Sequence, residues 1–187
     1  MKIASLVLSL ALVLLAPIFL GATPADVEVH FSPRGGCTEA VVAELGNARK
    51  TVYVQAYSFT SAPIAAALVD AHKRGVRVEV ILDKTQRTEK YSSADFISRA
   101  GIITYIDAKH AIAHNKIMVI DEGVIITGSF NFTTAAEEHN AENLLVIRDT
   151  KLAAKYLANW QAHLQHSQPY VPVRTMDQIP MPKRPGT

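Results

Sequence analysis

Segments of strand length alternate with segments of helix length along most of this chain, and this alternation constrains the fold more than any other feature. Strand-like apolar runs occupy residues 27–31, 51–57, 76–82 and 102–106. Helix-like segments between them occupy residues 38–50, 61–75 and 93–100. Repeated strand–helix units predict an α/β sandwich, with helices on both faces of one sheet.

The second half of the chain adds a hairpin to this pattern. Two strand-like runs, 113–120 and 124–127, are joined by Asp121-Glu122-Gly123. A further strand is expected at 143–147, and a last helix runs from after Asp149 to about residue 166. The hairpin makes a fully parallel sheet untenable, so we expect a mixed, mostly parallel sheet. The expected helix caps are Thr38, Asp149 and a capping box made by Thr134 with Glu137.

The composition excludes several classes of protein. The chain has 187 residues and a net charge of only +2, which does not suit a protein that coats nucleic acid through a large basic excess. Its one cysteine, Cys37, excludes an intrachain disulfide framework and a zinc site built on several cysteines. In an exported chain Cys37 is either free or paired with another chain, and a free residue after the Gly-Gly turn is the expected state.

The two ends of the chain differ from its middle. Met1-Lys2 precedes an uncharged apolar run, 3–20, followed by Gly21-Ala22, which predicts a signal peptide over residues 1–22 and export to the periplasm or beyond. The alternative is a retained membrane anchor, since about 18 apolar residues approach the minimum that spans a bilayer. Residues 23–166 form the predicted catalytic domain. The tail, 167–187, holds five of the nine prolines and is expected to be extended.

One segment, residues 114–131, concentrates residues suited to chemistry. Side chains alternate faces along a strand, so His114 and Lys116 point the same way. Ser129 and Asn131 share a face on the returning strand, and a hairpin can bring the two pairs together. One nucleophile or base, one cation and two neutral hydrogen-bonding groups suit a tetrahedral oxyanion such as phosphate. Gly128 would allow the backbone to approach a ligand.

The pattern H-x-K-x4-D-x6-G-S-x-N across residues 114–131 resembles the signature of the phospholipase D superfamily. Two further segments, 56–60 (AYSFT) and 141–143 (AEN), resemble the single-motif bacterial endonuclease branch of that superfamily. The resemblance covers roughly residues 26–165. It implies a phospholipase D-like α-β-α sandwich.

The resemblance also implies a mechanism. In this superfamily the motif histidine, here His114, attacks the phosphodiester phosphorus and forms a covalent phosphohistidine. A second motif histidine protonates the leaving oxygen. This chain has one such motif, so the resemblance implies a homodimer in which two copies share one site. Lys116, Ser129 and Asn131 would hold the nonbridging oxygens, and Glu142 would orient and charge the histidine.

Asp121 has the opposite strand parity to His114 and lies at the hairpin turn, so we predict a structural role for it. No metal or other cofactor is expected, because the superfamily chemistry needs none. His110 and His114 are four residues apart, but their segment is not helical and no matching acid cluster follows. We interpret Glu137, Glu138 and His139 as a solvated helix face.

The predicted substrate is a nucleic acid, DNA or RNA, cut by a nonspecific endonuclease. Basic residues near the motif are expected either to follow a phosphate backbone beside the cleft or to form a solvated loop: Lys84, Arg87, Lys90 and Lys109. The alternative is a lipid phosphodiesterase acting on phosphatidylcholine or cardiolipin, which retention of residues 3–20 would favour. A noncatalytic phosphate-binding module is the third possibility, and the intact His114 and Lys116 argue against it.

Overall fold

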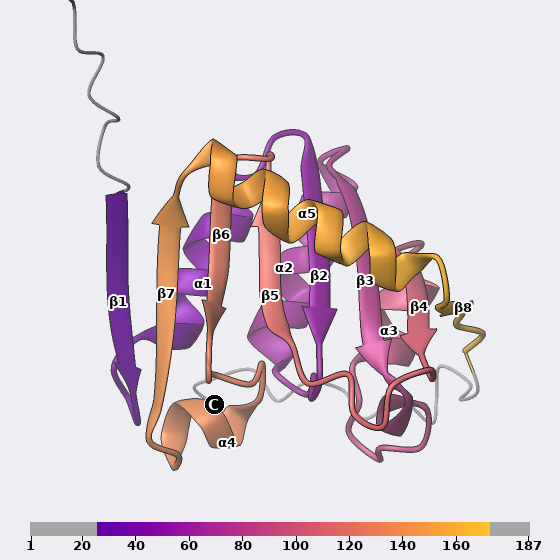
Figure 1. Cartoon of the computed structure of the whole chain (residues 1–187). Coiled ribbons are helices and arrows are strands. Elements are labelled where there is room, and N and C mark those ends of the chain that lie inside the picture. Colours follow the sequence, from indigo (N-terminus) through magenta and orange to yellow (C-terminus); the bar gives the residue numbers. More distant parts are fainter. Residues whose placement is uncertain (1–25, 173–187) are drawn as a thin grey trace, which may run out of the picture.

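The computed structural model describes residues 26–172 of the chain. The predicted signal peptide and most of the proline-rich tail lie outside these residues. One eight-stranded sheet has the order β1-β7-β6-β5-β2-β3-β4-β8 (Figure 1). Its strands are β1 (Asp26–Ser32), β2 (Thr51–Ala56), β3 (Arg77–Asp83), β4 (Ile103–Asp107), β5 (Lys116–Ile120), β6 (Val124–Gly128), β7 (Glu142–Arg148) and β8 (Gln168–Pro169).

Helices cover both faces of this sheet, as predicted. The helices are α1 (Cys37–Asn47), α2 (Ala62–Lys73), α3 (Ala94–Arg99), α4 (Thr134–Glu138) and α5 (Thr150–Leu164), and a short 3-10 helix, η1, spans Lys84–Arg87. Figure 1 shows α5 lying across one face, with α1, α2 and α3 behind the sheet. The α-β-α sandwich is therefore confirmed. No helix within residues 26–172 combines the length and apolar character needed to cross a membrane.

The expectation of a mostly parallel sheet is wrong. Of the seven strand pairings described, only β2–β3 and β3–β4 are parallel, and the other five are antiparallel. Crossovers through α2 and α3 produce the two parallel pairs. After β4 the chain re-enters the sheet beside β2 in the reverse direction, and β6 and β7 continue the antiparallel order.

The core has a layer on each side of the sheet. The larger layer, under α1 and α2, includes Leu45, Ile64 and Leu68, each fully buried. On the α5 side the fully packed indole of Trp160 donates from Nε1 to the Val54 carbonyl at 2.8 Å. Burying one large apolar side chain contributes about 1.5–3 kcal/mol to the free energy of folding. Apolar contact is therefore the main interaction that holds α5 to the sheet.

Two helix starts test the predicted caps. Asp149 caps α5 as expected, because its side chain accepts from the backbone N–H groups of Lys151 and Leu152 at 2.8 and 3.0 Å. The capping box at Thr134 is wrong by one residue. Thr133 is the cap of α4, and its hydroxyl accepts from Ala136 N at 3.1 Å.

The start of α1 also differs from the prediction. The helix begins at Cys37, so Thr38 lies inside its first turn, and the preceding Gly36 has a left-handed φ of 81°. The Glu137 carboxylate accepts from the backbone N–H groups of Gly36 and Thr38 at 3.3 and 2.7 Å. A carboxylate from α4 therefore caps α1, which is why Glu137 does not serve a capping box in its own helix.

The described part of the tail is not detached from the domain. Gln168 and Pro169 form β8 and pair with β4, and the buried Tyr170 donates from its hydroxyl to Asp95 at 2.9 Å. Cys37 is likewise buried, and burial together with the nearby Glu137 raises the pKa of its thiol to about 11. Within residues 26–172 Cys37 forms no disulfide, and its burial favours the free thiol over pairing with another chain.

Candidate active site

A pocket of about 480 Å³ lies where β5 begins and β6 ends. It brings together all five residues predicted to be catalytic, from three strand ends. Its lining residues are His114, Asn115, Lys116, Ile117, Thr127, Gly128, Ser129, Asn131, Glu142 and Tyr156. The sequence motif and Glu142, which follows it by eleven residues, therefore meet at one place.

His114 and Lys116 form the central contact of this pocket. Lys116 is the first residue of β5 and is 6% exposed, whereas His114 is exposed. Lys116 Nζ lies 2.9 Å from Nδ1 and 3.0 Å from Nε2 of His114, and it donates to the His114 carbonyl at 2.7 Å. Burial lowers the pKa of Lys116, and the charge of Glu142 opposes that shift. A cation held in a site of this kind attracts an anionic ligand more strongly than one in water.

Tyr57, the residue that follows β2, contacts both His114 and Lys116. Its ring packs against the His114 imidazole with centroids 4.6 Å apart and planes inclined by 50°. Lys116 Nζ lies 5.2 Å from the centroid of the same Tyr57 ring. Tyr57 belongs to the 56–60 segment noted in the sequence, but neither its role as a platform nor the presence of Tyr156 from α5 was predicted. No local pattern marks a residue on a distant helix.

Ser129 and Asn131 have polar atoms available for a ligand. Ser129 Oγ accepts from the backbone N and from Nδ2 of Asn143 at 3.1 and 3.3 Å, which leaves its hydroxyl proton to donate. Asn131 Oδ1 is buried and has no hydrogen-bond partner within the described part of the chain. This oxygen is an acceptor, so a contact of Asn131 with a phosphate oxygen would have to use its Nδ2 donor.

Gly128 is required for a reason other than the approach of a ligand. Its φ is 142°, and a Cβ at this position would lie 2.3 Å from the backbone oxygen of Asn143. No such contact is sterically possible. Gly128 therefore lets β6 lie close to β7, and this positions Ser129 beside the pocket.

Glu142 lines the pocket but does not contact the imidazole. Its Oε1 accepts from Asn140 Nδ2 at 3.2 Å, and within residues 26–172 no hydrogen bond joins it to His114. Within one chain its effect on the site is therefore electrostatic, through the charge of Lys116.

Asp121 lies at the other end of β5 and contacts only backbone. Its Oδ1 accepts from Lys50 N and Thr51 N at 2.7 and 2.9 Å, and its Oδ2 accepts from Arg49 N at 2.8 Å. Burial alone would raise the pKa of the Asp121 carboxyl, but these three hydrogen bonds lower it. The carboxylate fastens the loop before β2 to the hairpin turn, which agrees with the predicted structural role.

The basic residues expected beside the cleft do not line the pocket. Lys84 Nζ donates to the His110 carbonyl at 3.1 Å, and Arg87 Nη2 donates to Gln168 Oε1 at 3.3 Å. Both belong to η1, which follows β3, and the exposed Lys109 follows β4. Their contact with a phosphate backbone therefore stays a prediction about the surface outside the pocket.

All seven histidines fall within the described residues, and His114 alone lines the pocket. Three others, His110, His163 and His166, point at Asp107 instead. A nucleophilic imidazole, a buried cation and neutral donors around an open pocket define an enzyme site for phosphate-ester chemistry. Each chain therefore contributes a single imidazole to this pocket.

Comparison with known proteins identifies the family to which a site of this chemical class belongs. Residues 41–164 match the family model described as "Cardiolipin synthase, PLD-like domain". A Rickettsia bellii protein named phospholipase D is 45% identical over 136 residues, which cover 73% of this chain and 68% of that protein. A mitochondrial cardiolipin hydrolase of Chlamydomonas reinhardtii is 35% identical over 112 residues, or 60% of this chain and 50% of that protein.

The structural comparison agrees. Nuc from Salmonella typhimurium, described as a phospholipase D family member, matches with a TM-score of 0.76 and 37% identity, covering 79% of this chain and 99% of Nuc. The chain therefore belongs to the phospholipase D superfamily, which confirms the resemblance seen in the motif. It is a phosphodiesterase of that superfamily.

Proposed function

We propose that this protein is a nonspecific endonuclease that hydrolyses phosphodiester bonds in DNA or RNA at a site shared by two subunits. The observation that carries the proposal is the contact between exposed His114 and buried Lys116, in a pocket that contains no second histidine of the chain. The match to Nuc supports the substrate class, because it covers 99% of that protein at 37% identity.

In the first step an imidazole nitrogen of His114 attacks phosphorus, and the bond from phosphorus to the leaving oxygen breaks. His114 of the partner subunit gives its proton to that oxygen, so the leaving group departs as an alcohol. Lys116 and the donor groups of Ser129 and Asn131 hold the nonbridging oxygens while charge shifts among them. The products of this step are a free nucleic-acid end and a phosphohistidine.

In the second step water attacks the phosphohistidine. His114 of the partner subunit, now neutral, takes a proton from the water, and the phosphorus–nitrogen bond breaks to release a phosphomonoester. Two modest barriers replace one large one, which is the usual advantage of covalent catalysis. A denaturing alkaline quench, which preserves the acid-labile phosphorus–nitrogen bond, of enzyme incubated with a 32P-labelled oligonucleotide should yield labelled wild-type protein and unlabelled His114→Asn protein.

The shared site requires a homodimer, and this part of the proposal has its own test. Sedimentation should give twice the mass of the chain, and subunits mixed from wild type and His114→Asn should form heterodimers with at most partial activity. An active monomer in analytical ultracentrifugation would remove the shared-site mechanism. The reaction would then need a general acid other than His114 of the partner subunit.

A lipid phosphodiesterase is the second candidate, and a specific observation favours it. The Rickettsia bellii protein at 45% identity is named phospholipase D. Plasmid nicking and release of a labelled headgroup from phosphatidylcholine or cardiolipin vesicles should be measured side by side, with His114→Ala as the control. Nicking without headgroup release supports the nuclease. Headgroup release alone assigns the lipid substrate, and neither activity would leave a phosphate-binding module.

We also propose that the protein is exported and that its chemistry needs no metal. N-terminal sequencing of the exported protein should find residues 1–22 removed. An uncleaved terminus in a membrane fraction would replace this with the anchored alternative and would favour a lipid substrate. The two proposed steps use only imidazole, lysine and neutral donors, so activity should survive in EDTA. Loss of phosphohistidine formation that one divalent ion restores would contradict metal-free chemistry.

A further inference from the structure

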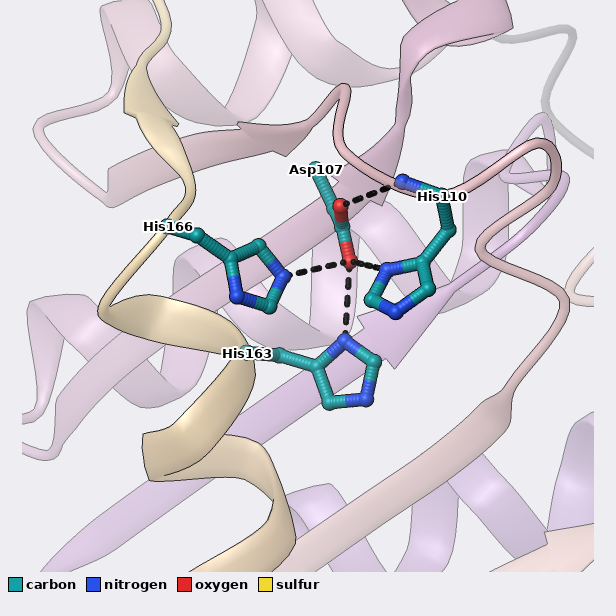
Figure 2. A group of neighbouring side chains, drawn as sticks. All are labelled: Asp107, His110, His163 and His166. Carbon is teal, nitrogen blue, oxygen red and sulfur yellow. Dashed lines mark hydrogen bonds and ion pairs between the residues drawn. The ribbon is translucent and has the colours of Figure 1, made fainter.

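A second cluster of chemically capable side chains lies outside the active-site pocket. Asp107, the last residue of β4, is completely buried, and three histidines surround its carboxylate (Figure 2). Its Oδ2 lies 2.9 Å from His110 Nδ1, 2.8 Å from His163 Nδ1 and 3.3 Å from His166 Nε2. None of the four residues lines the pocket that contains His114.

The two carboxylate oxygens of Asp107 have different surroundings. Oδ1 accepts from the backbone N–H groups of Lys109 and His110 at 3.1 and 3.5 Å. These contacts fix the orientation of the carboxylate, and Oδ2 is left facing the three imidazoles, as Figure 2 shows. The aspartate is thus held in place by the chain itself and presents one oxygen to three ring nitrogens.

The same three rings lie close to one another. Their centroids are 4.9 Å apart for His110 and His163, 5.1 Å for His110 and His166, and 5.4 Å for His163 and His166. One nitrogen from each ring and one carboxylate oxygen all lie within 4.8 Å of one another. Four donors converge here from two segments, the loop after β4 and the end of α5.

From this convergence we propose that Asp107, His110, His163 and His166 bind one zinc ion. Three imidazole nitrogens and one carboxylate oxygen form a closed tetrahedral set, which suits Zn²⁺ and is the arrangement of a structural site. Bonds of about 2.0–2.2 Å with tetrahedral angles place the ligand atoms about 3.4 Å apart. Small rotations of the three rings around the fixed carboxylate are enough to reach that spacing.

The position of the cluster indicates what the ion would do. It would join the C-terminal end of α5 to the 108–115 loop. This loop contains His110 near its start and His114 near its end. The same loop is already tied at two points, by Lys84 Nζ on the His110 carbonyl at 3.1 Å and by Ala113 N on Asp83 Oδ2 at 2.7 Å. Zinc would therefore add stability to a loop that these two hydrogen bonds already hold in position, and it would take no part in the phosphoryl transfer.

The test uses the full-length protein without an affinity tag, dialysed against a chelator and then titrated with Zn²⁺ by isothermal titration calorimetry. We expect one zinc per chain in the wild type, with Mg²⁺ and Ca²⁺ giving no comparable heat. Zinc at about 100 times its Kd should raise Tm by roughly 5–10 °C for a chain of this size. His163→Gln and His166→Gln should each abolish both effects.

Two controls separate this site from other histidines. His139→Gln changes an exposed histidine outside the cluster and should bind zinc as the wild type does. His114→Asn removes the nucleophile and should also bind zinc normally. Zinc binding is measured directly, so a failure of the proposed nuclease activity leaves this result unaffected, and the reverse also holds.

A measurement on the zinc-loaded wild type avoids dependence on variants that fold poorly. X-ray absorption at the zinc edge should show four nitrogen or oxygen ligands at about 2.0–2.2 Å, with a strong imidazole contribution and no sulfur. No zinc uptake by wild type would overturn the proposal. Zinc uptake that survives His163→Gln, or that is lost in His114→Asn, would also overturn it. An X-ray absorption spectrum with six oxygen ligands at the distances of bound water would do the same.

Discussion

The two ends of strand β5 hold residues from one sequence motif, yet their surroundings are opposite. At the beginning of β5, the His114 side chain is exposed, and the Ser129 hydroxyl, which only accepts from Asn143, keeps its proton to donate. At the far end of β5, both oxygens of Asp121 accept backbone hydrogen bonds, three in all. One end leaves its hydrogen-bonding capacity for a ligand, and the other uses it to hold the fold.

This difference separates catalysis from structure within a single motif. A group that binds substrate must keep donors or acceptors available until substrate arrives, and such a site adds little to stability. A group whose hydrogen bonds are all satisfied within the chain contributes to the free energy of folding instead. Substitutions at the two ends should therefore affect different measurements.

The largest effect is expected from His114→Ala. Removal of a covalent nucleophile should lower kcat by a factor on the order of 10⁴–10⁶. Because the side chain is exposed, the free energy of unfolding should change by no more than about 0.5 kcal/mol. Single-turnover cleavage of an oligonucleotide and urea unfolding measure the two quantities. A large loss of stability with substantial residual cleavage would reverse the assignment of this end of β5.

Lys116→Met tests the cation beside the nucleophile. The loss of one preorganised electrostatic donor should lower kcat by about 10²–10³. Stability should stay equal or rise, because burial disfavours the charged ammonium, as the lowered pKa of Lys116 shows, and methionine fills similar space. The measurements are steady-state cleavage and thermal unfolding. An unfolded Lys116→Met protein would mean that the lysine is mainly structural.

Asp121→Ala should have the opposite profile. Loss of a charged acceptor of three backbone hydrogen bonds should lower the free energy of unfolding by about 1–3 kcal/mol. Asp121→Asn keeps one oxygen and should cost less. Below its unfolding transition each variant should still form the phosphohistidine, which the denaturing alkaline quench measures. An Asp121→Asn protein that folds normally but forms no phosphohistidine would give Asp121 a catalytic role.

The smallest effect concerns pH. The folded pKa of Asp121 is lowered, so its charge contributes stability that is complete above the unfolded value of about 3.9 and is lost as pH falls through the folded value. The stability difference between wild type and Asp121→Asn should therefore be constant above about pH 5 and shrink below about pH 4. Urea unfolding of both proteins across this range is the measurement. A difference that grows on acidification would contradict the assignment.

Local pattern was a good guide where local interactions decide the outcome. The position of each main helix and strand followed from periodicity, and the Asp149 cap was correct because a cap depends on three or four adjacent residues. The caps of α1 and α4 were wrong because Glu137 serves a helix about 100 residues earlier. The antiparallel hairpin was correct, but the expected share of parallel strands was wrong, because most neighbours in the sheet are distant in the sequence.

The sequence by itself determined the chemistry of this protein. Residues 114–131 carry an imidazole, a cation and neutral hydrogen-bonding groups at a spacing that identifies the superfamily, and strand parity already separated Asp121 from His114. Only the tertiary structure decided which other groups meet. Asp107 and His163 are 56 residues apart, yet they are 2.8 Å apart in space. Contacts of that kind depend on how a helix crosses a sheet, and the periodicity of one segment does not determine that crossing.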